Sequence, residues 1–234
     1  MGSRGSMNLL DPRTFPIADI AHLVHALPPL GAEILVADLP GADAAVDWLN
    51  AHGRPARLVP APGDALPTRL WNPSPGLVPI LEHLVPQRAL DLGCGTGRDA
   101  VYLAMQGWQV TAVDRLPDAL DRARSLADLH GVQLELVALD TDRDPLPVGP
   151  FDLVTAFRFL LPFSVMVERL RSGGSLVIET FTDRERERTG KPRDANLVLP
   201  SAGPPLLPEG VVLRDYDVRV IEGRELACLW AVAD

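Results

Sequence analysis

An acidic residue followed by alternating glycines, Asp91-Leu-Gly-Cys-Gly-Thr-Gly97, is the stretch whose residue types and spacing best suit ligand binding. Its three glycines let the backbone turn sharply and approach a ligand without a side-chain clash. The apolar residues before it, 89–92, predict a short buried strand, and a helix is predicted to begin near Gly97. The unpaired amides of that helix would face the loop, and Asp91 would order the loop or meet a cationic ligand group.

The spacing excludes two common phosphate-binding loops. The pattern GxxxxGK[ST] is absent, and the dinucleotide fingerprint GxGxxG would need a third glycine where this chain has Arg98. Downstream, residues 108–114 predict a second strand that ends in Asp114, which lies 23 residues after Asp91. A ribose-binding carboxylate occupies about this place in doubly wound sheets. A purely structural strand-to-helix turn is the alternative reading of the glycine loop.

The elements that must position these residues follow in order. Three more strands are predicted at 133–139, 151–157 and 175–181, with helices at 77–84, 117–130 and 161–170. Two alternating runs at 211–220 and 224–232, separated by Gly223, predict an antiparallel hairpin. Ligands bind beyond the carboxyl ends of parallel strands, so Phe157 and Arg158 are expected beside a ligand.

Residues from about Trp71 to Ala233 resemble class I S-adenosylmethionine (SAM) dependent methyltransferases, and within them the small tellurite-resistance-type enzymes. The resemblance to the class rests on the glycine loop and Asp114. The resemblance to the subgroup rests on Arg158-Phe-Leu160, Gly173–Phe181 and Gly190-Lys-Pro-Arg193. The resemblance implies an α/β fold, Rossmann-like, with a doubly wound, mostly parallel seven-stranded sheet and an antiparallel C-terminal hairpin. It also implies SAM as the cofactor and a small molecule as the methyl acceptor.

In such enzymes the glycine loop and Asp91 would seat the methionine part of SAM, Asp114 the ribose and Asp140 the adenine amine. The residues expected to bind the cofactor are Asp91, Gly93, Cys94, Gly95, Arg98, Asp114, Arg115, Asp140, Thr141 and Phe157. An acidic surface turn is the alternative for Asp140. Arg158 is predicted to position an anionic group of the acceptor.

The acceptor is predicted to be nucleophilic as it arrives. No histidine follows a strand of the predicted sheet, so no histidine is placed to remove a proton. A carboxylate, a thiol or a small oxyanion is therefore favoured. A catalytically silent SAM-binding sensor or scaffold, with a partner-docking N-terminal module, is the alternative function.

Four segments are predicted along the chain. Residues 1–6 are typical of an expression leftover, 7–62 form a small α/β module, 63–75 form a Pro- and Gly-rich linker, and 76–234 form the methyltransferase domain. Within the module a helix is predicted at 16–27 and strands at 34–38 and 56–59. The module resembles part of a rhodanese-like domain, but its loop Asp38–Ala42 lacks the sulfur-accepting cysteine. A structural or recruiting role, with a protein as partner, is expected instead.

Composition narrows the remaining classes. The net charge of −9 argues against a nucleic-acid partner, and two cysteines form neither a disulfide framework nor a metal site. No apolar run is long enough to span a membrane and no secretory signal is visible, which predicts a cytoplasmic protein. Residues 182–210 are predicted to be irregular. Their five cations suit either a lid that gathers an anionic substrate or a solvated loop.

Overall fold

The structure is a computed structural model that describes residues 9–13, 15, 20, 24–28, 30–61 and 70–234. Its internal contacts divide the chain into two units, Met1–Asn72 with Asp128–Gly131, and Pro73–Ala127 with Val132–Asp234. The predicted expression leftover, most of the predicted linker and much of a helix predicted at 16–27 lie outside the described residues. No helix among the described residues is long and apolar enough to cross a bilayer.

The first unit contains a small parallel sheet. Its strands are β1 (Leu9–Leu10), β2 (Ile34–Ala37) and β3 (Ala56–Val59), in the order β1-β2-β3. Helix α2 (Ala42–Ala51) connects β2 to β3 and buries one face through Ala45 and Leu49, and the short 3-10 helix η1 spans Val24–Ala26. The strands predicted at 34–38 and 56–59 are confirmed.

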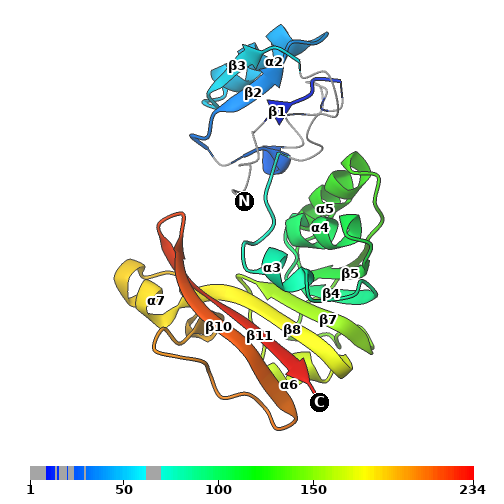
Figure 1. Ribbon diagram of the computed structural model, residues 1–234, viewed down its shortest axis with the longest axis vertical. Coiled ribbons are helices and arrows are strands. Elements are labelled where there is room, and N and C mark those ends of the chain that lie inside the picture. Colours follow the sequence, from blue (N-terminus) through cyan, green and yellow to red (C-terminus); the bar gives the residue numbers. More distant parts are fainter. Residues whose placement is uncertain (1–8, 14, 16–19, 21–23, 29, 62–69) are drawn as a thin grey trace. The chain divides into compact units, whose positions relative to one another are not determined.

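The second unit is built on a sheet with the strand order β10-β11-β8-β7-β4-β5-β6, and a short strand, β9, pairs with β8 (Figure 1). The strands are β4 (Arg88–Leu92), β5 (Gln109–Asp114), β6 (Glu135–Ala138), β7 (Phe151–Phe157), β8 (Leu170–Thr182), β9 (Val198–Leu199), β10 (Val211–Ile221) and β11 (Arg224–Ala233). Strands β8, β7, β4, β5 and β6 are parallel, and β11 is antiparallel to β8 and to β10. The doubly wound sheet and its C-terminal hairpin are therefore confirmed.

Helices cover both faces of this sheet. They are α3 (Leu77–Leu81), α4 (Arg98–Met105), α5 (Pro117–Leu129), α6 (Phe163–Val167), α7 (Asp183–Thr189) and the 3-10 helix η2 (Ala195–Leu197). One core cluster joins Leu153 of β7 to Leu103 of α4, and the other joins the next residue, Val154, to Met166 of α6. Adjacent residues of β7 are thus buried on opposite faces, as expected for a parallel strand between two helical layers.

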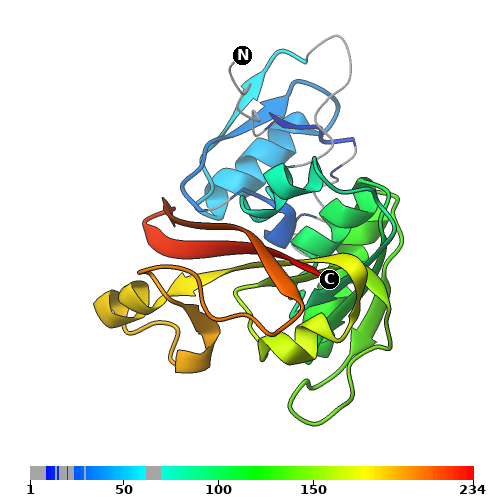
Figure 2. The same cartoon turned by 60° about the horizontal axis from the view of Figure 1, so that its bottom comes forward.

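The segment after β8 is more ordered than predicted. Thr182 caps α7 by accepting a hydrogen bond from Glu185 N at 3.0 Å, and Gly190, with φ +70°, ends the helix. The prediction of an irregular stretch over 182–210 is therefore wrong for α7, η2 and β9. The pattern Thr-x-x-Glu at 182–185 is the sequence signature of such a helix start. Figure 2 shows α7 and the segment that follows it (yellow to orange) beside the hairpin of β10 and β11.

Candidate active site

A cavity of about 490 Å³ opens at the carboxyl ends of β4, β5, β6 and β7. The order of the strands places it where β4 lies between β5 and β7, so that the chain runs outward in both directions from this point. Ligands bind at such switch points of open parallel sheets. The predicted site residues that line the cavity are Gly93, Asp114, Arg115, Asp140, Thr141 and Arg158.

The three loop glycines have left-handed backbones but different surroundings. Their φ angles are +66° at Gly93, +53° at Gly95 and +81° at Gly97. A Cβ on Gly93 would lie 2.6 Å from Phe159 Cγ, and one on Gly97 would lie 2.6 Å from Ala123 Cβ. A Cβ on Gly95 would meet nothing within 4 Å. Two of the glycines therefore serve packing, whereas Gly95 leaves open space beside the loop backbone.

Asp91 is the least satisfied polar group of the site. Its side chain is buried, its Oδ1 accepts a hydrogen bond from Thr155 Oγ1 at 2.8 Å, and its Oδ2 has no partner within the described structure. Burial, and next the charge of Asp99, raise the pKa of Asp91 to about 8. A buried carboxylate oxygen without a partner is costly, so its position suits a ligand that donates hydrogen bonds, above all a cation.

Asp114 ties the glycine loop to the end of β5. Its Oδ2 accepts a hydrogen bond from Gly95 N and its Oδ1 one from Leu116 N, both at 2.9 Å. Each carboxylate oxygen has a second lone pair, so Asp114 can also accept bonds from a ligand in the cavity that it lines. Asp140 is arranged similarly, because its Oδ1 accepts a bond from Asp142 N at 3.2 Å.

Arg158 is held by a buried carboxylate. Its backbone is left-handed, with φ +58°, and its guanidinium Nη1 lies 2.7 Å from Glu179 Oε1. Glu179 is completely buried, and its Oε2 accepts a hydrogen bond from Gly76 N at 2.9 Å. A guanidinium carries five N–H donors, so the ion pair leaves donors for a ligand. The Arg158 side chain is 38% exposed, which keeps it accessible.

A second carboxylate holds the segment before α3. Asp99, in the first turn of α4, accepts hydrogen bonds from Ser74 N at 2.6 Å and from Ser74 Oγ at 2.9 Å. Burial raises the pKa of Asp99. Asp99 and Glu179 together fix the backbone at Ser74 and Gly76. Sequence reasoning missed both roles. An acid in the first turn of a helix, such as Asp99, is most simply explained by the helix dipole, and Glu179 lies 103 positions along the chain from Gly76.

Five predicted cofactor residues do not line the cavity, and Asp91 and Gly95, described above, are two of them. Phe157 is buried in the core cluster with Leu77, and Phe159 lines the cavity in its place. Cys94 is half-buried, and burial raises the pKa of its thiol, so a reactive thiolate is disfavoured. Arg98 begins α4 outside the lining. The described residues contain no group of three or more His, Cys, Asp or Glu side chains that could hold a metal ion.

The cavity also has walls that the sequence did not predict. They include Leu116, Leu139, Asp142, Phe159, Leu160, Leu161, Asp194 and Leu197. Most of these follow directly on a predicted strand end, so the strand pattern was their signal. Asp194 and Leu197 come from the segment after β8, and no sequence motif predicts that they line the cavity.

The glycine loop, the acids at successive strand ends and the strand order define a Rossmann-like α/β domain with a ligand site at its switch point. Residues 89–173 match the methyltransferase domain family. A protein-L-isoaspartate O-methyltransferase of Methanoculleus marisnigri is 36% identical over 110 residues, which cover 44% of this chain and 50% of that protein. The chain spans about half the length of the curated relatives that it matches first.

Solved structures show the same fold. The N-methyltransferase NodS of Bradyrhizobium japonicum superposes with a TM-score of 0.54 at 19% identity, covering 68% of this chain and 92% of that one. TehB of Haemophilus influenzae superposes with a TM-score of 0.51 at 17% identity, covering 67% of this chain and 61% of that one. The second unit therefore has the Rossmann-like fold of these solved structures, and residues 89–173 within it match a methyltransferase domain.

Proposed function

We propose that this protein transfers the methyl group of SAM to a small acceptor whose nucleophilic atom is already electron-rich: a carboxylate, a thiol or an oxyanion. The observation that supports this most strongly is the buried Oδ2 of Asp91, which has no partner in the described structure and lies next to the glycine loop. SAM carries an ammonium group that would satisfy this oxygen with a charge-assisted hydrogen bond.

The residues present fit the rest of the cofactor. Asp114 would accept hydrogen bonds from the ribose hydroxyls, and Asp140 would accept one from the adenine amine, because both donors need an acceptor. Gly95 would let the loop backbone approach the methionine part closely. When bound, SAM supplies a methyl group on a sulfonium sulfur.

Transfer would need orientation more than acid–base chemistry. No histidine of the described chain lines the cavity, so an acceptor that arrives as a nucleophile suits the site. Arg158 would hold an anionic group of that acceptor, and Glu179 would fix the guanidinium. Aligning the nucleophile with the methyl group supplies most of the rate in such a displacement.

Several finer assignments belong to the same proposal. The motif Arg158-Phe-Leu160 supports the tellurite-resistance-type subgroup. We assign residues 7–62 to a rhodanese-like module that recruits a protein partner, 63–75 to a linker and 76–234 to the methyltransferase domain of a cytoplasmic enzyme.

The experiment is a turnover assay in which wild-type protein, SAM and a panel of small thiols, carboxylates and oxyanions are incubated and S-adenosylhomocysteine is quantified. Arg158→Lys keeps a cation near Glu179 but removes the bidentate fork. It should raise the acceptor KM about tenfold or more and leave S-adenosylhomocysteine binding unchanged. Equal KM and kcat in both proteins would exclude Arg158 from acceptor binding. A wild type that forms no product with any class would contradict the proposal.

A further inference from the structure

The candidate cavity is lined by more negative than positive side chains. The acids that line it are Asp114, Asp140, Asp142 and Asp194, and the cations are Arg115 and Arg158. Arg158 is already paired with the buried Glu179. With the cofactor bound, Asp114 and Asp140 would be engaged by its ribose and adenine, and an inorganic dianion would still meet repulsion from the carboxylates of Asp142 and Asp194. An organic acceptor that carries both charges would not.

Asp194 belongs to the segment after β8, residues 183–199, from which Asp194 and Leu197 form one wall of the cavity. Its Oδ1 accepts a hydrogen bond from Asn196 N at 2.8 Å, which caps η2 and leaves lone pairs of the carboxylate for a ligand. Leu197 O accepts a hydrogen bond from Thr180 Oγ1 at 2.7 Å. The next two residues, Val198 and Leu199, pair with β8. The wall that carries Asp194 is thus attached to the sheet.

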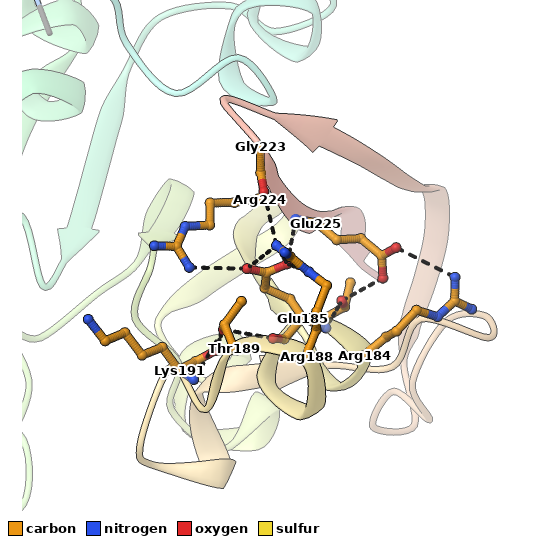
Figure 3. Close-up of polar contacts among 9 residues, drawn as sticks. Arg184, Glu185, Arg188, Thr189, Lys191, Gly223, Arg224 and Glu225 are labelled. Atoms are coloured by element: carbon orange, nitrogen blue, oxygen red, sulfur yellow. Dashed lines mark hydrogen bonds and ion pairs between the residues drawn. The ribbon is translucent and has the colours of Figure 1, made fainter.

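A buried carboxylate fixes the other end of this segment (Figure 3). Glu185 of α7 is 1% exposed, and its Oε2 lies 2.7 Å from Arg188 Nη2 while its Oε1 lies 3.2 Å from Arg224 Nη1. The Oε2 also accepts a hydrogen bond from Glu225 N at 3.2 Å. Arg188 Nη2 in turn donates to Gly223 O at 3.0 Å. Glu185 therefore joins the segment after β8 to the turn between β10 and β11.

Two of the five predicted lid cations, Arg184 and Arg188, form ion pairs with glutamates of the domain. Arg188 binds Glu185, and Arg184 lies 3.5 Å from Glu225. The segment after β8 is therefore better described as an anchored wall than as a cationic lid, and the charge that it contributes to the cavity lining is the acid Asp194.

We propose that Asp194 determines acceptor specificity by binding the ammonium group of a dipolar organic acceptor, while Arg158 holds its anionic group and Glu185 positions the wall that carries Asp194. This inference rests on the proposed methyl transfer and narrows its acceptor to small molecules with both an amine and an acidic or thiol group. It disfavours an inorganic oxyanion. Only the segment after β8, not the cofactor residues, would then need to change for an acceptor of another charge.

The test uses matched thiols with the full chain. L-Cysteine carries both charges, 3-mercaptopropionate lacks the ammonium group, cysteamine lacks the carboxylate, and selenite represents the oxyanions. Each is titrated calorimetrically into protein saturated with S-adenosylhomocysteine, and turnover is followed with SAM. In that turnover the thiolate sulfur bonds to the methyl carbon, the sulfonium C–S bond breaks with its electron pair going to sulfur, and the thiol proton goes to water.

Wild-type protein should bind cysteine about tenfold tighter than either half-molecule, which is the size of one charge-assisted hydrogen bond. Asp194→Asn should lower the affinity for cysteine to that for 3-mercaptopropionate and leave S-adenosylhomocysteine affinity unchanged. Equal or absent binding of the three thiols, a preference for selenite, or an unchanged ranking in Asp194→Asn would overturn the inference. Failure of the wild type to bind S-adenosylhomocysteine would overturn the proposed function itself.

Glu185→Gln tests the positioning role, with Glu187→Gln as its matched control on the exposed side of the same helix. Glu185→Gln should reduce the preference for cysteine over 3-mercaptopropionate while S-adenosylhomocysteine affinity stays constant, because the cofactor residues lie on other elements. Glu187→Gln should behave as wild type. If both variants kept the wild-type preference, Glu185 would have no positioning role.

Discussion

Asp91→Asn should weaken cofactor binding and at the same time stabilise the free protein. The carboxylate is buried, and its Oδ2 has no partner among the described residues. Asparagine keeps the shape and a hydrogen bond with Thr155 but removes the charge that would meet an ammonium group. Loss of one charge-assisted hydrogen bond should reduce S-adenosylhomocysteine affinity by about 1.5–3 kcal/mol, which is roughly 10- to 150-fold.

Proton linkage gives the same prediction a sharper form. Because burial raises the pKa of Asp91 to about 8 in the free protein, about nine in ten molecules hold the proton at pH 7. An ammonium group beside Oδ2 would favour the ionised form, so binding at pH 7 should release close to one proton. At pH 9 the release should fall to about a tenth of a proton, since the carboxyl is already ionised.

The assay is calorimetric titration with S-adenosylhomocysteine in two buffers of different ionisation enthalpy, which separates proton release from the heat of binding. Asp118→Asn, on an exposed position of α5, is the control. Wild type and control should release the proton, and Asp91→Asn should not. Equal proton release in Asp91→Asn, or none in the wild type at pH 7, would refute the reasoning.

The stability of the free protein follows from the same shift. The folded pKa of Asp91, about 8, lies above its unfolded value near 3.9, so the folded state holds the extra proton between them. Stability should therefore fall as pH rises from about 4 to 8. Asp91→Asn should remove this slope and raise the melting temperature at pH 8.

Four further variants test the loop, the buried ion pair and the segment after β8. Gly97→Ala should lower the melting temperature more than Gly95→Ala, because a Cβ on Gly97 would lie 2.6 Å from Ala123 Cβ. Gly95→Ala should mainly weaken S-adenosylhomocysteine binding. A larger loss of melting temperature in Gly95→Ala would contradict the packing role of Gly97. Glu179→Ala should lower the free energy of unfolding in urea by about 3–5 kcal/mol, since it removes a buried carboxylate that binds both Arg158 and Gly76 N. A loss under 1 kcal/mol would contradict that reasoning. The Glu185 carboxylate, whose pKa the hydrogen bond from Arg188 and then its other partners lower to about 2, contributes stability above its unfolded pKa near 4.3. That stability should be lost as pH falls from about 4 to 2, and Glu185→Gln should show a weaker acid dependence in the same unfolding titrations.

The sequence predicts the glycine loop and the strand ends well because both depend on local chemistry. Glycines are the residues that adopt left-handed backbone conformations at no steric cost, and all three glycines of the loop have positive φ. Asp114, Asp140 and Arg158 each follow a strand with a clear apolar pattern. In a parallel sheet the strand ends meet at one edge, so their convergence on one cavity needs only the topology.

The rest depends on contacts between distant residues. Phe157 and Phe159 are both aromatic and two positions apart, and only the packing of the chain beyond β7 puts one in the core and the other on the cavity. The hydrogen bond that Gly76 N donates to Glu179 joins residues 103 positions apart in the sequence. The position of Asp194 depends on a segment that is attached through Glu185 and β9, and no short motif encodes that arrangement.

The most direct test of the central claim is saturable binding of S-adenosylhomocysteine to the folded wild type, measured calorimetrically beside Asp114→Ala and the exposed control Asp118→Ala. Binding to a single site should be weakened at least tenfold (about 1.4 kcal/mol) by Asp114→Ala and left unchanged by the control. No binding to the folded wild type would contradict the account and leave the domain a methyltransferase in fold alone.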